Sequence, residues 1–357
     1  MSTPPELVGP AVGGALPFGE NPVATLEAAV WVMAAVVSTQ RQALSESLED
    51  VLAADAERTA VLESAGLVRR DADGFAVHPS LVQADALTAR SAVEAKLSSL
   101  RQAVSAAASD AEAAGLGWGA QGDEVLLRQG RASAATGRAL AGKVVPALPG
   151  CAERLRAQGS RVLDVGTGVG ALAVVLAASF PEVRVEGIDV LERALDLAGA
   201  ELSAADPAVT ARVFLRRENA AELSEEERYE LIWLPAPFLS EEALRAALPR
   251  LAAALVPGAW LVAGTNPAAD DALRRSVGRW TATRGGGNSF DTARMSEELV
   301  GLGLEETRTF PTVPGGPVLV AARRPAGLSA PRDQSDAALR PSSRPAAVTS
   351  QSISASS

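Results

Sequence analysis

The sequence contains very little cysteine and histidine. Among its 357 residues there is one cysteine, Cys151, and one histidine, His78. A single cysteine excludes an intramolecular disulfide, and one residue of each type makes a Cys/His metal cluster implausible. We therefore predict no metal site, since metal chemistry would have to rely on carboxylates alone. Histidine, the most frequent general base in enzymes, is therefore absent from the chain after residue 78.

The chain also lacks an excess of positive charge and a long apolar run. Its 33 basic and 43 acidic residues give a net charge of -10, which disfavours nucleic acid and anionic membranes as main partners. No uninterrupted apolar run approaches about 18 residues, and the N-terminus shows no targeting pattern. Because 47% of the residues are hydrophobic, a buried core is expected. We expect a soluble, cytoplasmic protein with a small-molecule partner.

Composition divides the chain into five parts. Proline and glycine without periodicity predict a flexible arm over residues 1–21, and Ser, Pro and Ala without aromatics predict a disordered tail over 325–357. A mainly helical unit is predicted for 22–83, and alanine-rich connecting helices for 84–159. Strand and helix patterns then alternate through 160–324. A large domain preceded by a smaller one follows from this division.

The smaller unit is predicted to contain three helices and a β-hairpin whose turn carries Asp73 and Gly74. This pattern is similar to a winged-helix domain, although no specific motif supports the similarity. The segment holds four basic residues and nine acidic ones, so phosphates would repel it. We therefore expect it to serve dimerisation or to pack against a substrate cavity, and not to bind DNA.

The larger domain is predicted to be an α/β fold. The runs RVLDV, VRVEGIDV, ARVFLRR, YELIWL and AWLVAG are typical of strands, and most are separated by helical segments. Such alternation implies right-handed crossovers and a parallel sheet covered on both faces. Two later runs, LEETRTF and PVLVAARR, suit an antiparallel pair at the sheet edge. The sequence therefore predicts a Rossmann-like sheet of about seven strands.

The segment RVLDVGTGVG places glycines where the first of these strands turns into its helix. Ligands of doubly wound sheets bind at this turn. Gly166, Gly168 and Gly170 permit positive φ, and their missing Cβ atoms let a ligand lie against the backbone. Asp189 ends the second strand, where a carboxylate can accept both hydrogen bonds from a ribose diol. These residues predict a ligand that contains a nucleoside.

Two nucleoside ligands compete for this turn. The spacing from Gly166 through Gly168 to Ala171 fits the dinucleotide fingerprint, so spacing alone leaves NAD open. Asp164 favours a different ligand, because a carboxylate suits a positive amino group better than a pyrophosphate. The helical unit before the motif and the antiparallel edge after it also depart from the usual dinucleotide arrangement.

These motifs resemble those of class I S-adenosylmethionine-dependent methyltransferases. VLDVGTGVG looks like the first family motif, GIDV like the second and PGAWLVAG like the strand after its Pro-Gly turn, over residues 160–323. The resemblance implies S-adenosylmethionine as the cofactor, with the methionine part near Asp164 and the glycine loop, and the ribose on Asp189. The cofactor-binding residues that it implies are Asp164, Gly166, Thr167, Gly168, Gly170, Asp189, Val190, Asn219, Ala220 and Leu234. Glu218 is an equally plausible alternative to Asn219 near the adenine.

The whole arrangement resembles the small-molecule O-methyltransferases of secondary metabolism. In that family the N-terminal unit forms a homodimer and helps to close the substrate cavity, which predicts a homodimer here. Trp233, Pro235 and Phe238 are then expected to line the substrate site. Trp118 could also line the substrate pocket, although such an aromatic is more often part of a core or dimer interface.

The sequence departs from this family at the expected base, because LPAPFLSEE contains no histidine. Asp270, Asp271 and Asp291 are candidate carboxylates, yet such residues are more often helix caps, so the catalytic residue stays unassigned. A phenol, enol or carboxylate substrate that is already ionised would need no base. Two alternatives stay open: an enzyme that retains the cofactor without transferring methyl, and, less favoured, a ligand-sensing regulator.

Overall fold

The computed structural model describes residues 21–326 except for 73, 83–84, 109–116, 267–270 and 313–316. The predicted arm lies outside the described residues apart from Asn21, and the predicted tail apart from its first two residues. Asp270 also falls outside them, so these predictions stay untested.

The N-terminal part contains the predicted helices and hairpin. Its elements are α1 (Pro22–Gln42), α2 (Leu48–Ala54), α3 (Ala56–Ser64), β1 (Val68–Asp71) and β2 (Gly74–Val77), and the two strands pair antiparallel. Ser47 and Asp55 cap α2 and α3 by accepting hydrogen bonds from backbone N–H groups of the first turns. A small apolar core holds the unit together and includes the fully buried Leu62. The predicted helices and hairpin strands are confirmed, whereas Asp73 of the predicted turn lies outside the described residues.

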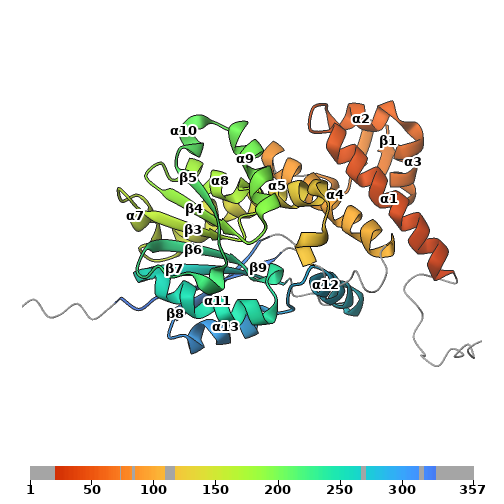
Figure 1. The fold of residues 1–357 in the computed structure, drawn as a ribbon. Coiled ribbons are helices and arrows are strands. Elements are labelled where there is room, and N and C mark those ends of the chain that lie inside the picture. The colour runs from red at the N-terminus through yellow and green to blue at the C-terminus, as the bar shows by residue number, and fades with distance from the viewer. Residues whose placement is uncertain are drawn as a thin grey trace, which may run out of the picture. The chain divides into compact units, whose positions relative to one another are not determined.

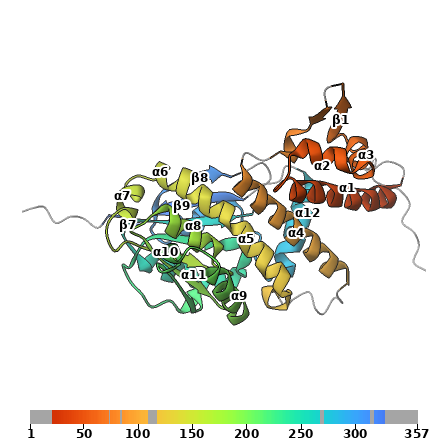
Figure 2. The ribbon, with the colours of Figure 1, turned by 90° about the horizontal axis from the view of Figure 1, so that it is seen from above.

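A series of helices connects this unit to the sheet. The elements are η1 (Pro79–Leu81), α4 (Ala86–Ala108), η3 (Gly117–Ala120), α5 (Asp123–Ala139), the π turn η4 (Leu140–Val144), α6 (Val145–Ala147) and α7 (Cys151–Leu155). Helix α5 lies between α4 and α8 (Figure 2). Two glycines allow its close approach to α8 and to the loop before it, since a Cβ at Gly130 would overlap Val169 of the loop and a Cβ at Gly137 would lie 3.0 Å from Val175 of α8.

A seven-stranded sheet forms the centre of the described C-terminal part (Figure 1). Its strands are β3 (Arg161–Val165), β4 (Arg184–Asp189), β5 (Val213–Arg217), β6 (Tyr229–Pro235), β7 (Leu255–Thr265), β8 (Glu305–Pro311) and β9 (Val318–Arg323). The order is β5-β4-β3-β6-β7-β9-β8. Strands β3 to β7 pair in parallel, whereas β9 pairs antiparallel with both β7 and β8. The predicted α/β fold and its antiparallel edge are confirmed.

Helices cover the sheet on both faces. The remaining elements are α8 (Ala171–Ser179), α9 (Glu192–Ser203), α10 (Pro207–Thr210), η5 (Ala220–Glu222), η6 (Ala236–Phe238), α11 (Glu241–Ala254), α12 (Ala272–Arg284) and α13 (Thr292–Gly301). Because strand side chains alternate between faces, Val162 packs in the core shared with α8, and Leu163 in the core shared with α11 and α13. Between β5 and β6 the chain forms only the short turn η5, where the other parallel crossovers carry longer helices.

Candidate cofactor and active site

The glycine loop after β3 adopts a conformation that strongly favours glycine. Gly166, Gly168 and Gly170 have φ values of 60°, 57° and 77°, a region in which residues with a Cβ are strained. Gly170 also occupies the N-cap of α8. Around Gly168 there is open space where a Cβ would point. The loop therefore presents bare backbone at the carboxyl edge of the sheet, where a ligand of this fold binds.

Asp189 ties the end of β4 to this loop. Its Oδ2 accepts a hydrogen bond of 2.9 Å from the Gly168 N–H, and its Oδ1 accepts one of 2.9 Å from the Leu191 N–H. A carboxylate offers about four acceptor positions, so each oxygen retains one for a ligand hydroxyl. Burial raises the pKa of Asp189 against the effect of these backbone hydrogen bonds. The next residue, Val190, is exposed beside it.

Asp164 lies beneath the loop and is 1% exposed. Its Oδ2 accepts a hydrogen bond of 2.8 Å from the Thr167 hydroxyl, and the Thr167 N–H donates to the Ile188 carbonyl at 3.0 Å. Burial and, to a smaller extent, the charge of Asp189 together raise the pKa of Asp164 to about 7, against the lowering effect of the Thr167 hydrogen bond. A positively charged group nearby would favour the ionised form of this carboxyl.

Gly187, the glycine of the GIDV motif, is required by close packing against the glycine loop. A Cβ at this position would lie 2.7 Å from Thr167 Oγ1 and 2.7 Å from Leu215 Cδ2. The strand can pass beneath the loop only because that Cβ is missing. The glycine therefore fixes the distance between β4 and the loop, a packing role that is not apparent from the motif alone.

The segment after β5 lies next to Asp189, whose backbone carbonyl accepts a hydrogen bond of 3.0 Å from the Glu218 N–H. The Glu218 carboxylate forms an ion pair of 2.6 Å with Arg216. Asn219 caps η5 by accepting a hydrogen bond from the Ala221 N–H, and Ala220 is buried. Both side chains therefore already have protein partners, since the Asn219 amide also donates to Glu222 at 3.3 Å.

The carboxyl end of β6 lies beside the glycine loop. Leu234 and Pro235 are buried, and Pro235 Cγ lies 3.4 Å from the position of a Cβ at Gly166. Trp233 points into the core shared with α8, with its ring against Gly264. Of the three residues predicted to line the substrate site, Phe238 is the most exposed, at 43%.

A turn from the connecting region reaches the same edge of the sheet. The Trp118 ring packs edge-to-face against Phe238, with centroids 5.1 Å apart. A Cβ at Gly119 would lie 3.7 Å from Leu191, and one at Gly286 would lie 3.2 Å from Gly117. The turn η3 therefore touches segments that follow β4, β6 and α12. Trp118 therefore lies next to a residue predicted to line the substrate site, and the glycines around it were the available signal in the sequence.

Two of the candidate catalytic carboxylates act as N-caps of helices. Asp271 accepts a hydrogen bond from the Arg274 N–H at the start of α12, and Asp291 accepts one from the Arg294 N–H at the start of α13. His78 likewise accepts from the Ser80 N–H at the start of η1. Within the described part of the chain, no three His, Cys, Asp or Glu side chains form a group that could hold a metal ion.

A sequence comparison identifies the part of the chain that carries this edge. Residues 162–258 match the family model of a methyltransferase domain, and that range contains the glycine loop and Asp189. This segment of the chain is therefore similar to a methyltransferase domain. Over 89 residues it is 35% identical to the ribosomal protein uL3 glutamine methyltransferase of Bradyrhizobium diazoefficiens. That match covers 25% of this chain and spans only 27% of the relative's length.

Solved structures share the fold over most of the chain. Human N-acetylserotonin methyltransferase, solved with S-adenosylmethionine, has a TM-score of 0.57 and 13% identity over 87% of this chain and 100% of that one. The pyocyanin biosynthetic protein PhzM has a TM-score of 0.55 and 16% sequence identity, over 85% of this chain and 98% of that one. An O-methyltransferase family protein from Burkholderia thailandensis has a TM-score of 0.50 and 17% sequence identity, over 86% of this chain and 99% of that one. At these identities the likeness concerns the fold.

S-adenosylmethionine is the cofactor that a class I methyltransferase domain implies, and the residues at this edge fit it. The loop leaves open space above Gly168 for a ligand at the backbone. Asp189 keeps acceptor positions suited to two ribose hydroxyls. The buried Asp164 has one hydroxyl partner among the described residues and favours a cationic neighbour. A dinucleotide would instead bring pyrophosphate charge towards this carboxylate.

Proposed function

We propose that this protein binds S-adenosylmethionine and transfers its methyl group to a small organic substrate, at an oxygen atom. The main support is the pair of carboxylates at the glycine loop, one buried below it and one hydrogen-bonded to its Gly168 N–H. A cofactor with a ribose diol and positive charge complements this pair. Secondary metabolism remains a prediction, drawn from the resemblance to small-molecule O-methyltransferases.

The chain's own residues would act mainly by binding and orientation. The bound cofactor supplies a methyl group that its sulfonium charge already activates. Asp164 would face the cationic part and Asp189 would hold the ribose, and together they would orient the bound cofactor. Pro235, Phe238 and Trp118 exclude water around the acceptor oxygen, which makes an oxygen anion more reactive. A phenol, enol or carboxylate that arrives ionised needs no base.

Calorimetric titration of S-adenosylmethionine and NAD into the full chain tests the cofactor. We expect binding of S-adenosylmethionine in the micromolar range, lost in Asp189→Ala and retained in Asp196→Ala, which removes an exposed carboxylate from α9. Candidate phenols and polyketides are then incubated with the cofactor and analysed for a gain of one methyl mass. Preferential binding of NAD would contradict S-adenosylmethionine as the cofactor. Binding of S-adenosylmethionine without any methylated product would favour a non-methylating enzyme.

We also propose that α1 forms a homodimer contact. Its exposed apolar side chains include Trp31, which is 74% exposed, together with Val23, Leu26, Val30 and Met33. Among the described helices, α1 alone is long and apolar enough to cross a membrane by length and composition, with 22% of its most apolar window buried. A second copy of the chain would cover this face without a membrane, as expected for a cytoplasmic enzyme.

Light scattering after size-exclusion chromatography tests whether a second copy of the chain, and not a membrane, covers this face of α1. We expect a dimer for the wild type and a monomer for Trp31→Glu, with Trp280→Glu on α12 as a control for another exposed tryptophan. Flotation with phospholipid vesicles provides the second readout. A monomeric wild type that floats with the vesicles would contradict the dimer and show a membrane contact.

A further inference from the structure

A hollow lined by arginines lies on the sheet at a distance from the glycine loop. Its volume is about 300 Å³, and its lining comes from β3, β4, β5 and the residue that precedes β6. Arg161 and Arg184 are the first residues of β3 and β4, whereas Asp189 is the last residue of β4. The hollow therefore lies towards the amino ends of β3 and β4, although Arg216 is near the carboxyl end of β5.

The short turn between β5 and β6 accounts for the hollow. A crossover helix at this place would cover β4 and β5 on the α11 face, but the described chain between these strands forms only η5. Phe214, the second residue of the edge strand β5, is 40% exposed on this surface. The sequence keeps charged and aromatic side chains on this uncovered surface.

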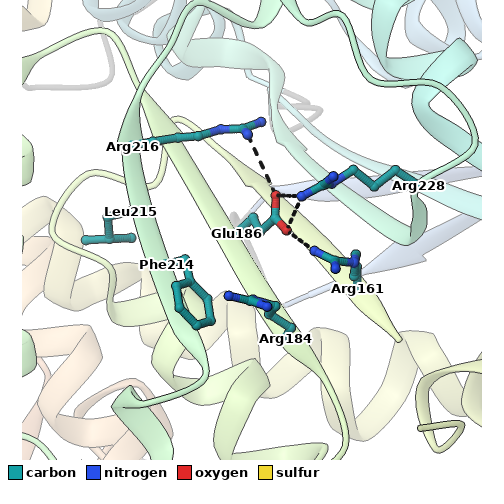
Figure 3. A pocket seen from close by; sticks show the side chains of 7 residues that line it. All are labelled: Arg161, Arg184, Glu186, Phe214, Leu215, Arg216 and Arg228. Carbon is teal, nitrogen blue, oxygen red and sulfur yellow. Dashed lines mark hydrogen bonds and ion pairs between the residues drawn. The ribbon is translucent and has the colours of Figure 1, made fainter. Parts of the chain in front are cut away.

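Arginines surround one buried carboxylate at the floor of the hollow (Figure 3). Glu186 pairs with Arg161 at 2.6 Å and with Arg228 at 2.9 Å, and Arg216 lies 3.8 Å away. Its other oxygen accepts a hydrogen bond of 2.9 Å from the Tyr229 hydroxyl. Burial alone would raise the pKa of Glu186, but hydrogen bonds from Arg228, Tyr229 and Arg161 hold it below the ordinary value. The carboxylate is therefore ionised near neutral pH.

The positive charge of this hollow exceeds what the nearby carboxylates neutralise. Arg216 also pairs with Glu218 and Glu225, each at 2.6 Å, so four arginines meet three carboxylates in total. The fourth arginine, Arg184, rests on the Phe214 ring, with 3.7 Å between its guanidinium carbon and the ring centroid. Among the described residues no carboxylate pairs with it. This local excess occurs in a protein whose net charge is -10.

We propose that the hollow binds a small anion that carries a carboxylate or a phosphate group, with Arg184 as its main contact. A guanidinium resting on an aromatic ring keeps the N–H groups at its edge available, and their planar arrangement matches two oxygens of one anion. Arg161, whose Cα pairs with that of Arg184 across β3 and β4, supplies a second positive charge. The volume lies at the lower limit for small-molecule sites, which suits a compact ligand.

The test uses inorganic phosphate and succinate as probes, titrated calorimetrically into the full chain at constant ionic strength. We expect saturable binding of at least one probe at a single site. In Arg184→Gln this binding should weaken by roughly tenfold or more, because a charge-assisted hydrogen bond is lost. Arg279→Gln, which removes an exposed arginine from α12, is the matched control and should bind like the wild type. The probe that binds identifies the anion class.

Two more variants separate a binding site from a purely structural charge cluster. Glu186→Gln removes the negative charge at the floor, so it should strengthen anion binding. Arg184→Lys keeps the charge but loses the planar arrangement, so it should bind more weakly than the wild type even if Arg184→Gln does not fold. Binding of neither probe, or equal binding by Arg184→Gln, Arg184→Lys and the control, would overturn the proposal. Unchanged affinity of Arg184→Gln for S-adenosylmethionine would show that the two sites are separate.

Discussion

At the residue scale, the position of Asp164 beneath the glycine loop has consequences for stability. Its pKa of about 7 exceeds the ordinary carboxyl value of 3.8, so between these values the folded chain holds a proton that the unfolded chain has lost. The contribution of Asp164 is therefore greatest below about pH 4 and disappears as the pH rises through 7. The free energy of unfolding should fall over this range by up to about 1.4 kcal/mol per pH unit.

We expect Asp164→Asn to flatten that slope, because asparagine does not titrate. The measurement is urea unfolding at a series of pH values from 4 to 8, compared between the variant and the wild type. Asp196→Asn, on the exposed surface of α9, should leave the slope unchanged. The affinity for S-adenosylmethionine should rise with pH through 7 in the wild type, because the ionised carboxylate attracts its positive charge. Identical slopes in all three proteins would show that Asp164 ionises normally.

At the element scale, the close packing of α5 against α8 holds the glycine loop in place. Because a Cβ at Gly130 would overlap the stiff, branched Val169 of that loop, Gly130→Ala should destabilise the chain by about 1–3 kcal/mol. It should also weaken cofactor binding through displacement of the loop. Chemical unfolding and calorimetric titration measure the two effects.

A matched glycine on another helix provides the control. No atom lies within 4 Å of the position of a Cβ at Gly199 in α9, so Gly199→Ala should be neutral or stabilise by up to about 1 kcal/mol. If the two alanine variants had equal stability and equal affinity, the contact between α5 and the loop would be unimportant.

At the scale of the whole molecule, the cofactor site joins segments that are distant in the sequence. The turn η3 reaches residues after β4, β6 and α12, so a ligand at this edge should stabilise the fold as a unit. At one hundred times its dissociation constant, S-adenosylmethionine should add about 2.7 kcal/mol to the free energy of unfolding. Thermal unfolding should show a higher midpoint for the wild type and none of this increase for Asp189→Ala. An equal increase in both would indicate binding elsewhere.

Periodicity and local motifs were sufficient to predict the main elements and the glycine loop. Alternating strand and helix patterns determine a parallel sheet because each strand must bury both faces, and the glycines after RVLDV determine a turn with positive φ. The antiparallel edge followed from the short turn-rich segment between its two strands. These features depend on neighbours in sequence, so one chain was enough to predict them.

Other properties were decided only by tertiary packing. The sequence alone could not show that Trp118 meets Phe238, that Gly130 makes room for Val169, or that Trp233 points into the core. Nor could it show that the arginines of two strands and a loop converge on Glu186. The physical reason is that each of these contacts joins residues far apart in the chain. Their meeting depends on strand order and register, which local propensity does not specify.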